Sequence, residues 1–180
     1  MQSIRIVFID LDGTLLSSSH KILESSAFAL SELIHQNIHV VITTGRCLTG
    51  MKEAIKSLPF HLPAPVSVHN GALILNRGKI TRKVPIAVNT VINLVKKARS
   101  LNIRIGFQTE SDTYLDQEIG EDERAFNLQG MKPIVVDDIL DLDIELIKVS
   151  FYGHENDING LLSYFSMEGG SEEYLSFAAG

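Results

Sequence analysis

The chain has 180 residues, of which 44% are hydrophobic and 21% charged, with a formal net charge of −6. This composition is typical of one ordinary or two small globular domains and argues against a disordered chain. The negative charge argues against broad nucleic-acid binding, and a single cysteine excludes an internal disulfide framework. Because no apolar run suits a signal peptide or approaches the roughly 20 residues of a membrane span, we expect a cytoplasmic protein without membrane contact.

Two strands and a helix are predicted at the N-terminus. Residues 4–9, IRIVFI, read as a buried strand, because the run is short, β-branched and followed by Asp and Gly. Apolar residues at helical spacing over 23–34 predict a helix, which Ser25 or Ser26 could cap. The run IHVVIT, 38–43, predicts a second strand. These elements form a βαβ unit, and its strands are expected to be parallel with a right-handed crossover.

A second helix is predicted at about 47–57, and it ends before the proline-rich segment 58–65. The run VSVHNGALIL, 66–75, predicts a third strand, a turn at Asn70 and Gly71, and a short return strand. Asn-Gly between two apolar runs is a strong hairpin signal.

After about residue 76 the sequence becomes polar and basic. Val88, Val91, Val95 and Ala98 predict one face of an amphipathic helix. The segments IRIGFQT and ELIKVSFYG alternate apolar with polar residues, as half-solvated antiparallel strands do, and NDINGLLSYFS predicts another helix. This half is expected to be an α+β module whose sheet is open on one face.

Polar residues follow each of the three apolar strands at its carboxyl end. They are Asp10-Leu11-Asp12-Gly13-Thr14, Thr43-Thr44-Gly45-Arg46 and His69-Asn70-Gly71. Taken alone, each of these segments is most simply explained as a polar turn. Ligands bind at the carboxyl ends of parallel strands, so three such ends in series predict one shared site.

Phosphoryl transfer is the chemistry that fits these residues. The Asp10 carboxylate can attack phosphorus, and Asp12 can protonate the leaving group and then activate water. Residues two apart on an extended strand face the same side, so both could meet one substrate. A magnesium ion would offset the negative charges, and Gly13, Thr44 and Gly45 could donate hydrogen bonds to phosphate oxygens.

The motifs DLDGTLL, TTGR and NGA, in this order, resemble those of the haloacid dehalogenase-like hydrolases, in particular the Cof-type phosphatases with a large cap. The resemblance implies an α/β fold. A partial Rossmann-like parallel-sheet core would occupy residues 1–76, and an α+β cap would occupy 77–180. It also implies Mg²⁺ as cofactor and a small phosphorylated metabolite as substrate.

The same resemblance assigns roles to residues. Asp10 would be the nucleophile and Asp12 the general acid/base, and both would hold the metal, Asp12 through its backbone carbonyl. Thr44, rather than Thr43, would be the phosphate-binding hydroxyl. The candidate phosphate- or substrate-binding residues are Leu11, Gly13, Thr44, Gly45, Arg46, Asn70 and Gly71.

The family carries two further motifs after its cap, a lysine and an acidic GDxxND-type segment, and neither is found in this sequence. Residues 153–162 resemble the acidic motif superficially, but Asn156 or Asp157 is better explained as a helix N-cap. We therefore expect a truncated copy, a fragment, or half of a protein that a partner chain completes. An unpaired sheet edge would then favour self-association.

Two alternatives to a phosphatase stay open at this point. A phosphotransferase or phosphomutase would use the same chemistry with a sugar hydroxyl as acceptor. A non-catalytic protein would keep the phosphate cradle without turnover.

Among the other polar residues, His20 is expected to be solvated, and Cys47 is expected to pack at a helix start. Arg77, Lys79, Arg82 and Lys83 form a basic stretch that is expected to be a solvated hinge strand.

Overall fold

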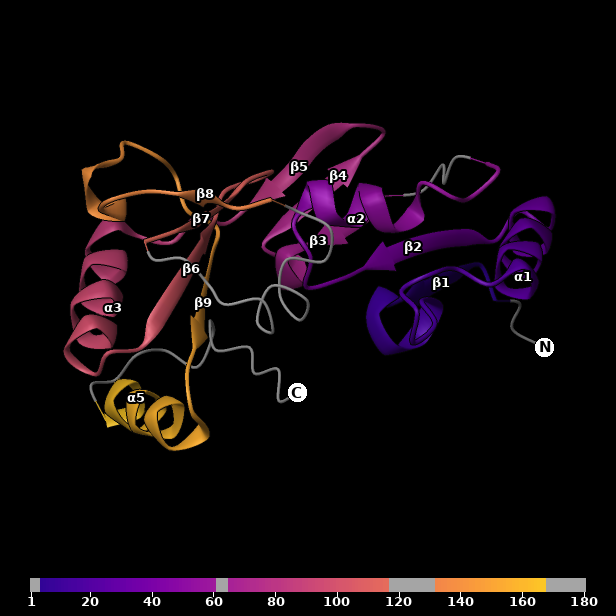
Figure 1. Cartoon of the computed structure of the whole chain (residues 1–180). Helices are drawn as coiled ribbons and strands as arrows, with labels where there is room; N and C mark the ends of the chain where they lie inside the picture. Colours follow the sequence, from indigo (N-terminus) through magenta and orange to yellow (C-terminus); the bar gives the residue numbers. More distant parts are fainter. Residues whose placement is uncertain (1–3, 61–64, 117–131, 168–180) are drawn as a thin grey trace.

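The computed structural model describes residues 4–60, 65–116 and 132–167, and these form two modules that each contain one sheet (Figure 1). The first module holds strands β1 to β5, and the second holds strands β6 to β9. Within the described ranges, no helix is long and apolar enough to cross a membrane.

The sheet of the first module has the order β1-β2-β3-β4-β5. Its strands are β1 (Ile6–Ile9), β2 (His39–Thr43), β3 (Val66–Val68), β4 (Leu73–Asn76) and β5 (Lys79–Lys83). β1 with β2 and β2 with β3 are parallel pairs, whereas β3 with β4 and β4 with β5 are antiparallel. The predicted parallel strands and the hairpin at Asn70 and Gly71 are therefore confirmed. The boundary between modules after residue 76 stays a prediction, and β5 belongs to the first sheet.

Two helices accompany this sheet, α1 (Glu24–His35) and α2 (Leu48–Ile55). The predicted serine cap of α1 is wrong. The helix begins after Leu23, which makes no side-chain cap hydrogen bond, so Ser25 and Ser26 lie inside its first turn. At α2, the Cys47 sulfur accepts a hydrogen bond from the Gly50 N–H.

Strand β1 is more exposed than its sequence predicts. Ile6 is 46% and Phe8 62% exposed, so the prediction of a buried strand is wrong for these side chains. In the described part of the chain β1 pairs with β2 alone and lies at the edge of the sheet. An apolar run identifies a strand, but it does not say what covers each face of that strand.

The second sheet has the order β8-β7-β6-β9. Its strands are β6 (Arg104–Gln108), β7 (Thr113–Leu115), β8 (Ile134–Val135) and β9 (Lys148–Tyr152), and the helices α3 (Val88–Ser100) and α5 (Glu155–Met167) belong to the same module. The pairing of β6 with β9 is antiparallel, as predicted. The predicted alternation is wrong, because the three central residues of β6 are all buried and β9 is half-buried throughout.

The packing of α3 corrects one predicted residue. Val91, Val95 and Ala98 are buried in the second core, as predicted, but Val88 is 72% exposed. Val88 is the first residue of the helix, so its side chain lies at the end of the stripe and outside the core.

The helix α5 begins at Glu155, so Asn156 and Asp157 lie inside the helix. The predicted N-cap at these residues is wrong, and the carbonyl of His154 accepts the first N–H groups instead. Segment 153–162 runs from the end of β9 into α5, and Leu161 is buried in the second core.

The two modules contact one another through the loop that follows β6. The carbonyl of Glu110 accepts hydrogen bonds from the Leu48 N–H at 3.2 Å and from His69 Nε2 at 3.3 Å. Lys83 in the basic stretch forms ion pairs with Glu110 and Glu145. The second module is therefore anchored beside the carboxyl ends of β2 and β3.

Candidate active site

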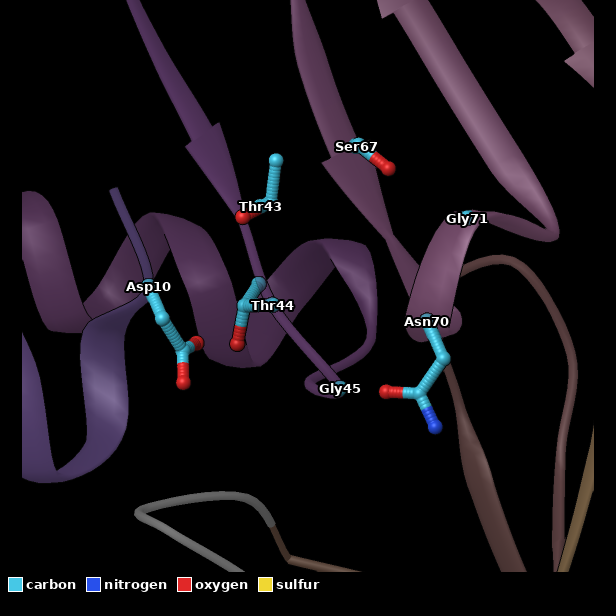
Figure 2. A pocket seen from close by; sticks show the side chains of 7 residues that line it. All are labelled: Asp10, Thr43, Thr44, Gly45, Ser67, Asn70 and Gly71. Carbon is cyan, nitrogen blue, oxygen red and sulfur yellow. The ribbon is translucent and has the colours of Figure 1, made fainter. Parts of the chain in front are cut away.

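A pocket of about 440 Å³ lies at the carboxyl ends of β1, β2 and β3. It is lined by Asp10, Thr43, Thr44, Gly45, Ser67, Asn70 and Gly71. Figure 2 shows the Asp10 carboxylate, the Thr44 hydroxyl and the Asn70 amide turned toward the same open space, although each follows a different strand. The predicted meeting of three strand ends therefore occurs.

Backbone hydrogen bonds hold the loops after β2 and β3 together. The Thr44 N–H donates to the Ser67 carbonyl at 2.9 Å, and the Asn70 N–H donates to the Thr44 carbonyl at 3.1 Å. Asn70 and Gly71 have φ angles of 55° and 92°, in the left-handed region that Asn and Gly tolerate best. The Asn-Gly pair is thus needed for the turn that presents the Asn70 side chain.

The absence of a side chain at Gly45 makes room for Asn70. A Cβ at Gly45 would lie 2.5 Å from Asn70 Oδ1, well inside van der Waals contact. Any other residue there would push the amide away from its present position. Gly45 therefore lets the Asn70 amide stay at the pocket.

Asp10 presents its carboxylate at the pocket, and Oδ1 accepts a hydrogen bond from the Leu11 N–H at 2.7 Å. The Leu11 side chain is fully buried and anchors the turn Leu11–Leu15 in the first core. Gly13 lies in the same turn with a φ of 72°. Neither Leu11 nor Gly13 is among the residues that line the pocket.

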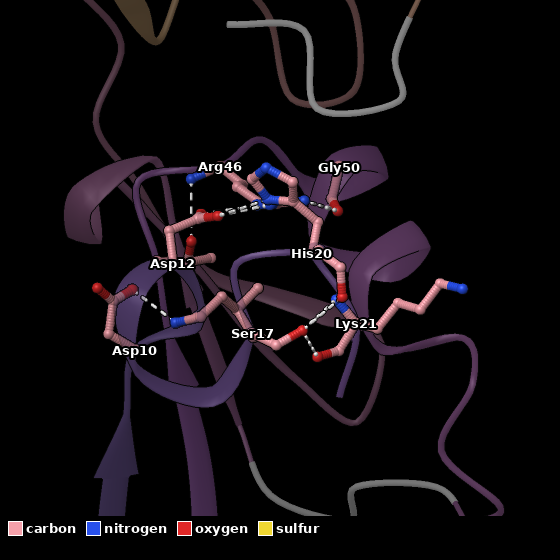
Figure 3. Close-up of polar contacts among 10 residues, drawn as sticks. Asp10, Asp12, Ser17, His20, Lys21, Arg46 and Gly50 are labelled. Carbon is pink, nitrogen blue, oxygen red and sulfur yellow. Dashed lines mark hydrogen bonds and ion pairs between the residues drawn. The ribbon is translucent and has the colours of Figure 1, made fainter. Parts of the chain in front are cut away.

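The Asp12 carboxylate contacts Arg46 (Figure 3). Arg46 Nε donates to Oδ2 at 2.8 Å and Nη2 donates to Oδ1 at 2.6 Å, a bidentate pair. Arg46 Nη1 also approaches the Gly50 carbonyl of α2 at 3.5 Å, and its side chain is only 5% exposed. His20 Nδ1 lies 4.0 Å from Asp12 Oδ1.

The pairing turns the Asp12 carboxylate toward Arg46. Asp10 lines the pocket, and Asp12 and Arg46 do not. The strand alternation does not extend to Asp12, because β1 ends at Ile9 and the chain turns over Leu11–Leu15. Arg46 therefore fixes the orientation of the Asp12 carboxylate and is not itself a pocket residue.

Two buried residues beside the pocket are neutral. Burial raises the pKa of the Cys47 thiol, which agrees with its expected packing role. Burial lowers the pKa of His69, whose side chain contacts the Glu110 carbonyl. Neither side chain adds a formal charge to the site at neutral pH.

Hard oxygen donors at the pocket suit a magnesium ion. The Asp10 carboxylate is available there, and Mg²⁺ commonly uses one or two carboxylates together with waters and substrate phosphate. Within residues 4–60, 65–116 and 132–167, no group of three or more His, Cys, Asp or Glu side chains comes together around a metal position. The donor set therefore fits a site that also uses backbone, water and ligand oxygens.

Sequence reasoning missed Ser67 and passed over Thr43, and both line the pocket. Ser67 lies inside the apolar strand β3 and not after it, so it is not one of the polar residues at the strand ends. Its one signal was a hydroxyl between two valines in VSV.

The fold and pocket define an α/β protein with a site at the carboxyl ends of parallel strands and an attached α+β module. The model of the haloacid dehalogenase-like hydrolases matches residues 7–177, so the chain belongs to this family. A haloacid dehalogenase-like hydrolase from Bacteroides thetaiotaomicron superposes with a TM-score of 0.81 at 20% identity, over 92% of this chain and 64% of that one. A structure from the same organism, described among the phosphatases of this superfamily, has a TM-score of 0.74 at 26% identity, over 91% and 61%.

Sequence similarity to curated proteins extends over part of the chain. Bacillus subtilis YkrA, named as a phosphatase, is 29% identical over 94 residues, which are 52% of this chain and 35% of YkrA. The aligned parts amount to 27%, 35% and 42% of the first three curated relatives. The chain thus spans less than half the length of these proteins.

Proposed function

We propose that this chain carries the phosphoryl-transfer site of a magnesium-dependent phosphatase that acts on small phosphorylated metabolites in the cytoplasm. The observation that carries the proposal is the pocket itself. A carboxylate, a hydroxyl and an amide from three strand ends converge there, and a glycine beside them leaves room for the amide. The family membership and the phosphatase names among the relatives support the reaction class.

In the proposed reaction, an Asp10 oxygen attacks the substrate phosphorus, and the bond from phosphorus to the leaving oxygen breaks. Protonated Asp12 donates its proton to that oxygen, and the resulting carboxylate, which Arg46 then holds, later accepts a proton from the water that cleaves the aspartyl phosphate. Inorganic phosphate leaves and the Asp10 carboxylate is restored. The Thr44 hydroxyl and the Asn70 amide bind phosphate oxygens, and Arg46 holds Asp12.

Asp10 and the backbone carbonyl of Asp12 would hold Mg²⁺. The ion would offset the charge of a carboxylate and a phosphate that repel each other by about 1 kcal/mol at 4 Å in water, and by more at a partly buried site.

We expect the purified chain to release inorganic phosphate from an aryl phosphate in the presence of Mg²⁺ and to lose this activity on chelation with EDTA. A colorimetric phosphate assay with Mg²⁺ added back provides the measurement. Turnover that persists in EDTA contradicts the metal requirement. Binding of phosphate without turnover would favour the non-catalytic alternative, and transfer to an added sugar would favour a phosphotransferase.

The β1 edge supports a further part of the proposal, self-association of the chain. Ile6 and Phe8 on β1 are exposed, and so are Leu23 and Phe28 of the first module, at 54% and 68%. Exposed apolar edges of this kind pair readily with another chain.

Sedimentation velocity on the purified chain is expected to show a species larger than the monomer. Phe8→Lys should shift it to monomer, whereas Val88→Lys on the second module should not. A wild-type chain that stays monomeric at millimolar concentration contradicts self-association.

A further inference from the structure

Lys148 connects the second module to the loop that forms the pocket. It is the first residue of β9, opposite Gln108 on β6. Its ammonium group reaches the first module and donates a hydrogen bond to the Gly45 carbonyl at 2.9 Å. Sequence reasoning gave this lysine no role.

The ammonium lies against the loop that contributes Gly45 to the pocket, although Lys148 itself is not among the lining residues. The position that a Cβ of Gly45 would occupy is 3.6 Å from Lys148 Nζ and 2.5 Å from Asn70 Oδ1. Gly45 and Asn70 both line the pocket. The lysine is therefore placed where a group bound against the loop after β2 could contact it.

The charge of Lys148 has no nearby counter-charge among the described residues. No carboxylate oxygen of those residues forms an ion pair with it within 4.0 Å. The adjacent Cys47 and His69 side chains are neutral, because burial raises the pKa of the thiol and lowers that of the imidazole. Burial also lowers the pKa of Lys148, because it removes the ammonium group from water. An ammonium has three N–H donors, and the Gly45 carbonyl accepts only one of these.

The pocket, in turn, needs a positive charge to hold an anion. Asp10 is negative and faces the pocket, and the guanidinium of Arg46 is occupied by Asp12. A cation that is partly buried without a counter-charge is costly, and an anionic ligand removes that cost for both partners.

We propose that Lys148 is an anion-binding residue of this site, which contacts the phosphate group of the ligand together with Asn70 and the loop Thr44–Gly45. The inference rests on the proposed function and adds a ligand contact from the second module. A phosphate bound there is held by both modules at once, so it stabilises their present contact.

The test compares binding of inorganic phosphate to the purified chain by isothermal titration calorimetry, for wild type, Lys148→Met, Lys148→Arg and the control Lys96→Met. Lys96 is an exposed lysine on α3. Lys148→Met is expected to lower phosphate affinity at least tenfold. Lys148→Arg should retain most of the affinity, because it keeps the charge, and Lys96→Met should match wild type.

Thermal unfolding without ligand separates this role from a purely structural one. If Lys148 only ties the modules together, Lys148→Met lowers the melting temperature of the ligand-free chain. If it binds an anion, that temperature stays equal or rises, because an uncompensated charge has been removed, and only the increase caused by phosphate is lost.

Two failures can be told apart. A wild-type chain that binds no phosphate contradicts the proposed function and this inference together. If Lys148→Met leaves phosphate binding unchanged, the inference alone is contradicted. It is also contradicted if Lys148→Met and Lys148→Arg lose phosphate affinity to the same extent and both lower the stability of the ligand-free chain.

Discussion

Replacing Asp10 by asparagine is expected to reduce kcat for an aryl phosphate by about 10³-fold or more, the scale seen when a catalytic nucleophile is removed. The substitution keeps the shape of the side chain at the pocket and removes the oxygen nucleophile. The hydrogen bond that the Leu11 N–H donates to Asp10 can still be made to the amide oxygen. The fold should therefore survive, and steady-state phosphate release measures the chemical step directly.

The same substitution is expected to strengthen phosphate binding while it reduces turnover, and this combination makes the prediction specific to Asp10. In the absence of divalent metal, Asp10→Asn should bind inorganic phosphate about fivefold more tightly than wild type, since it removes a repulsion of about 1 kcal/mol at 4 Å. Asp137→Asn, an exposed aspartate of the second module, is the matched control and should change neither quantity. Near-normal turnover by the Asp10 variant shows that another group is the nucleophile.

The location of the site could be predicted from sequence, because it depends on topology alone. Strands that follow one another through crossovers place their carboxyl ends on the same edge, so polar residues after each apolar run had to meet. The pairing of β1, β2 and β3 in that order confirms this reasoning. The Asn-Gly turn was predictable for a similar reason, since it requires left-handed backbone that few residues adopt.

The directions of side chains could not be predicted in the same way. Strand alternation predicts that Asp12 faces the same side as Asp10. The alternation ends where the chain turns after Ile9, and the Asp12 carboxylate pairs with Arg46. Lys148 is more than 70 residues from any pocket motif and reaches the loop only through the packing of two modules. The exposure of Phe8 depends on what lies against β1, which its own sequence does not encode.

Replacing Arg46 by methionine is expected to lower kcat about 10- to 100-fold, although Arg46 does not line the pocket. Methionine fills much of the same buried volume and lacks the two N–H groups that fix Asp12. The Asp12 carboxylate then samples several orientations and meets the leaving oxygen less often. The free energy of unfolding should fall by about 1–2 kcal/mol, less than for a fully buried pair, because the Asp12 side chain is 36% exposed and water partly replaces the lost partner.

A double-mutant cycle shows whether Arg46 acts through Asp12. The variant Arg46→Met with Asp12→Asn should be no slower than Asp12→Asn alone, because the positioned group is already gone. Arg99→Met is the control, since Arg99 is likewise paired with aspartate, here Asp116 and Asp138, but in the second module. It should lower stability and leave kcat unchanged. If the losses in kcat from the Arg46 and Asp12 substitutions simply multiply, Arg46 contributes to turnover independently, and its assignment as the residue that positions Asp12 is wrong.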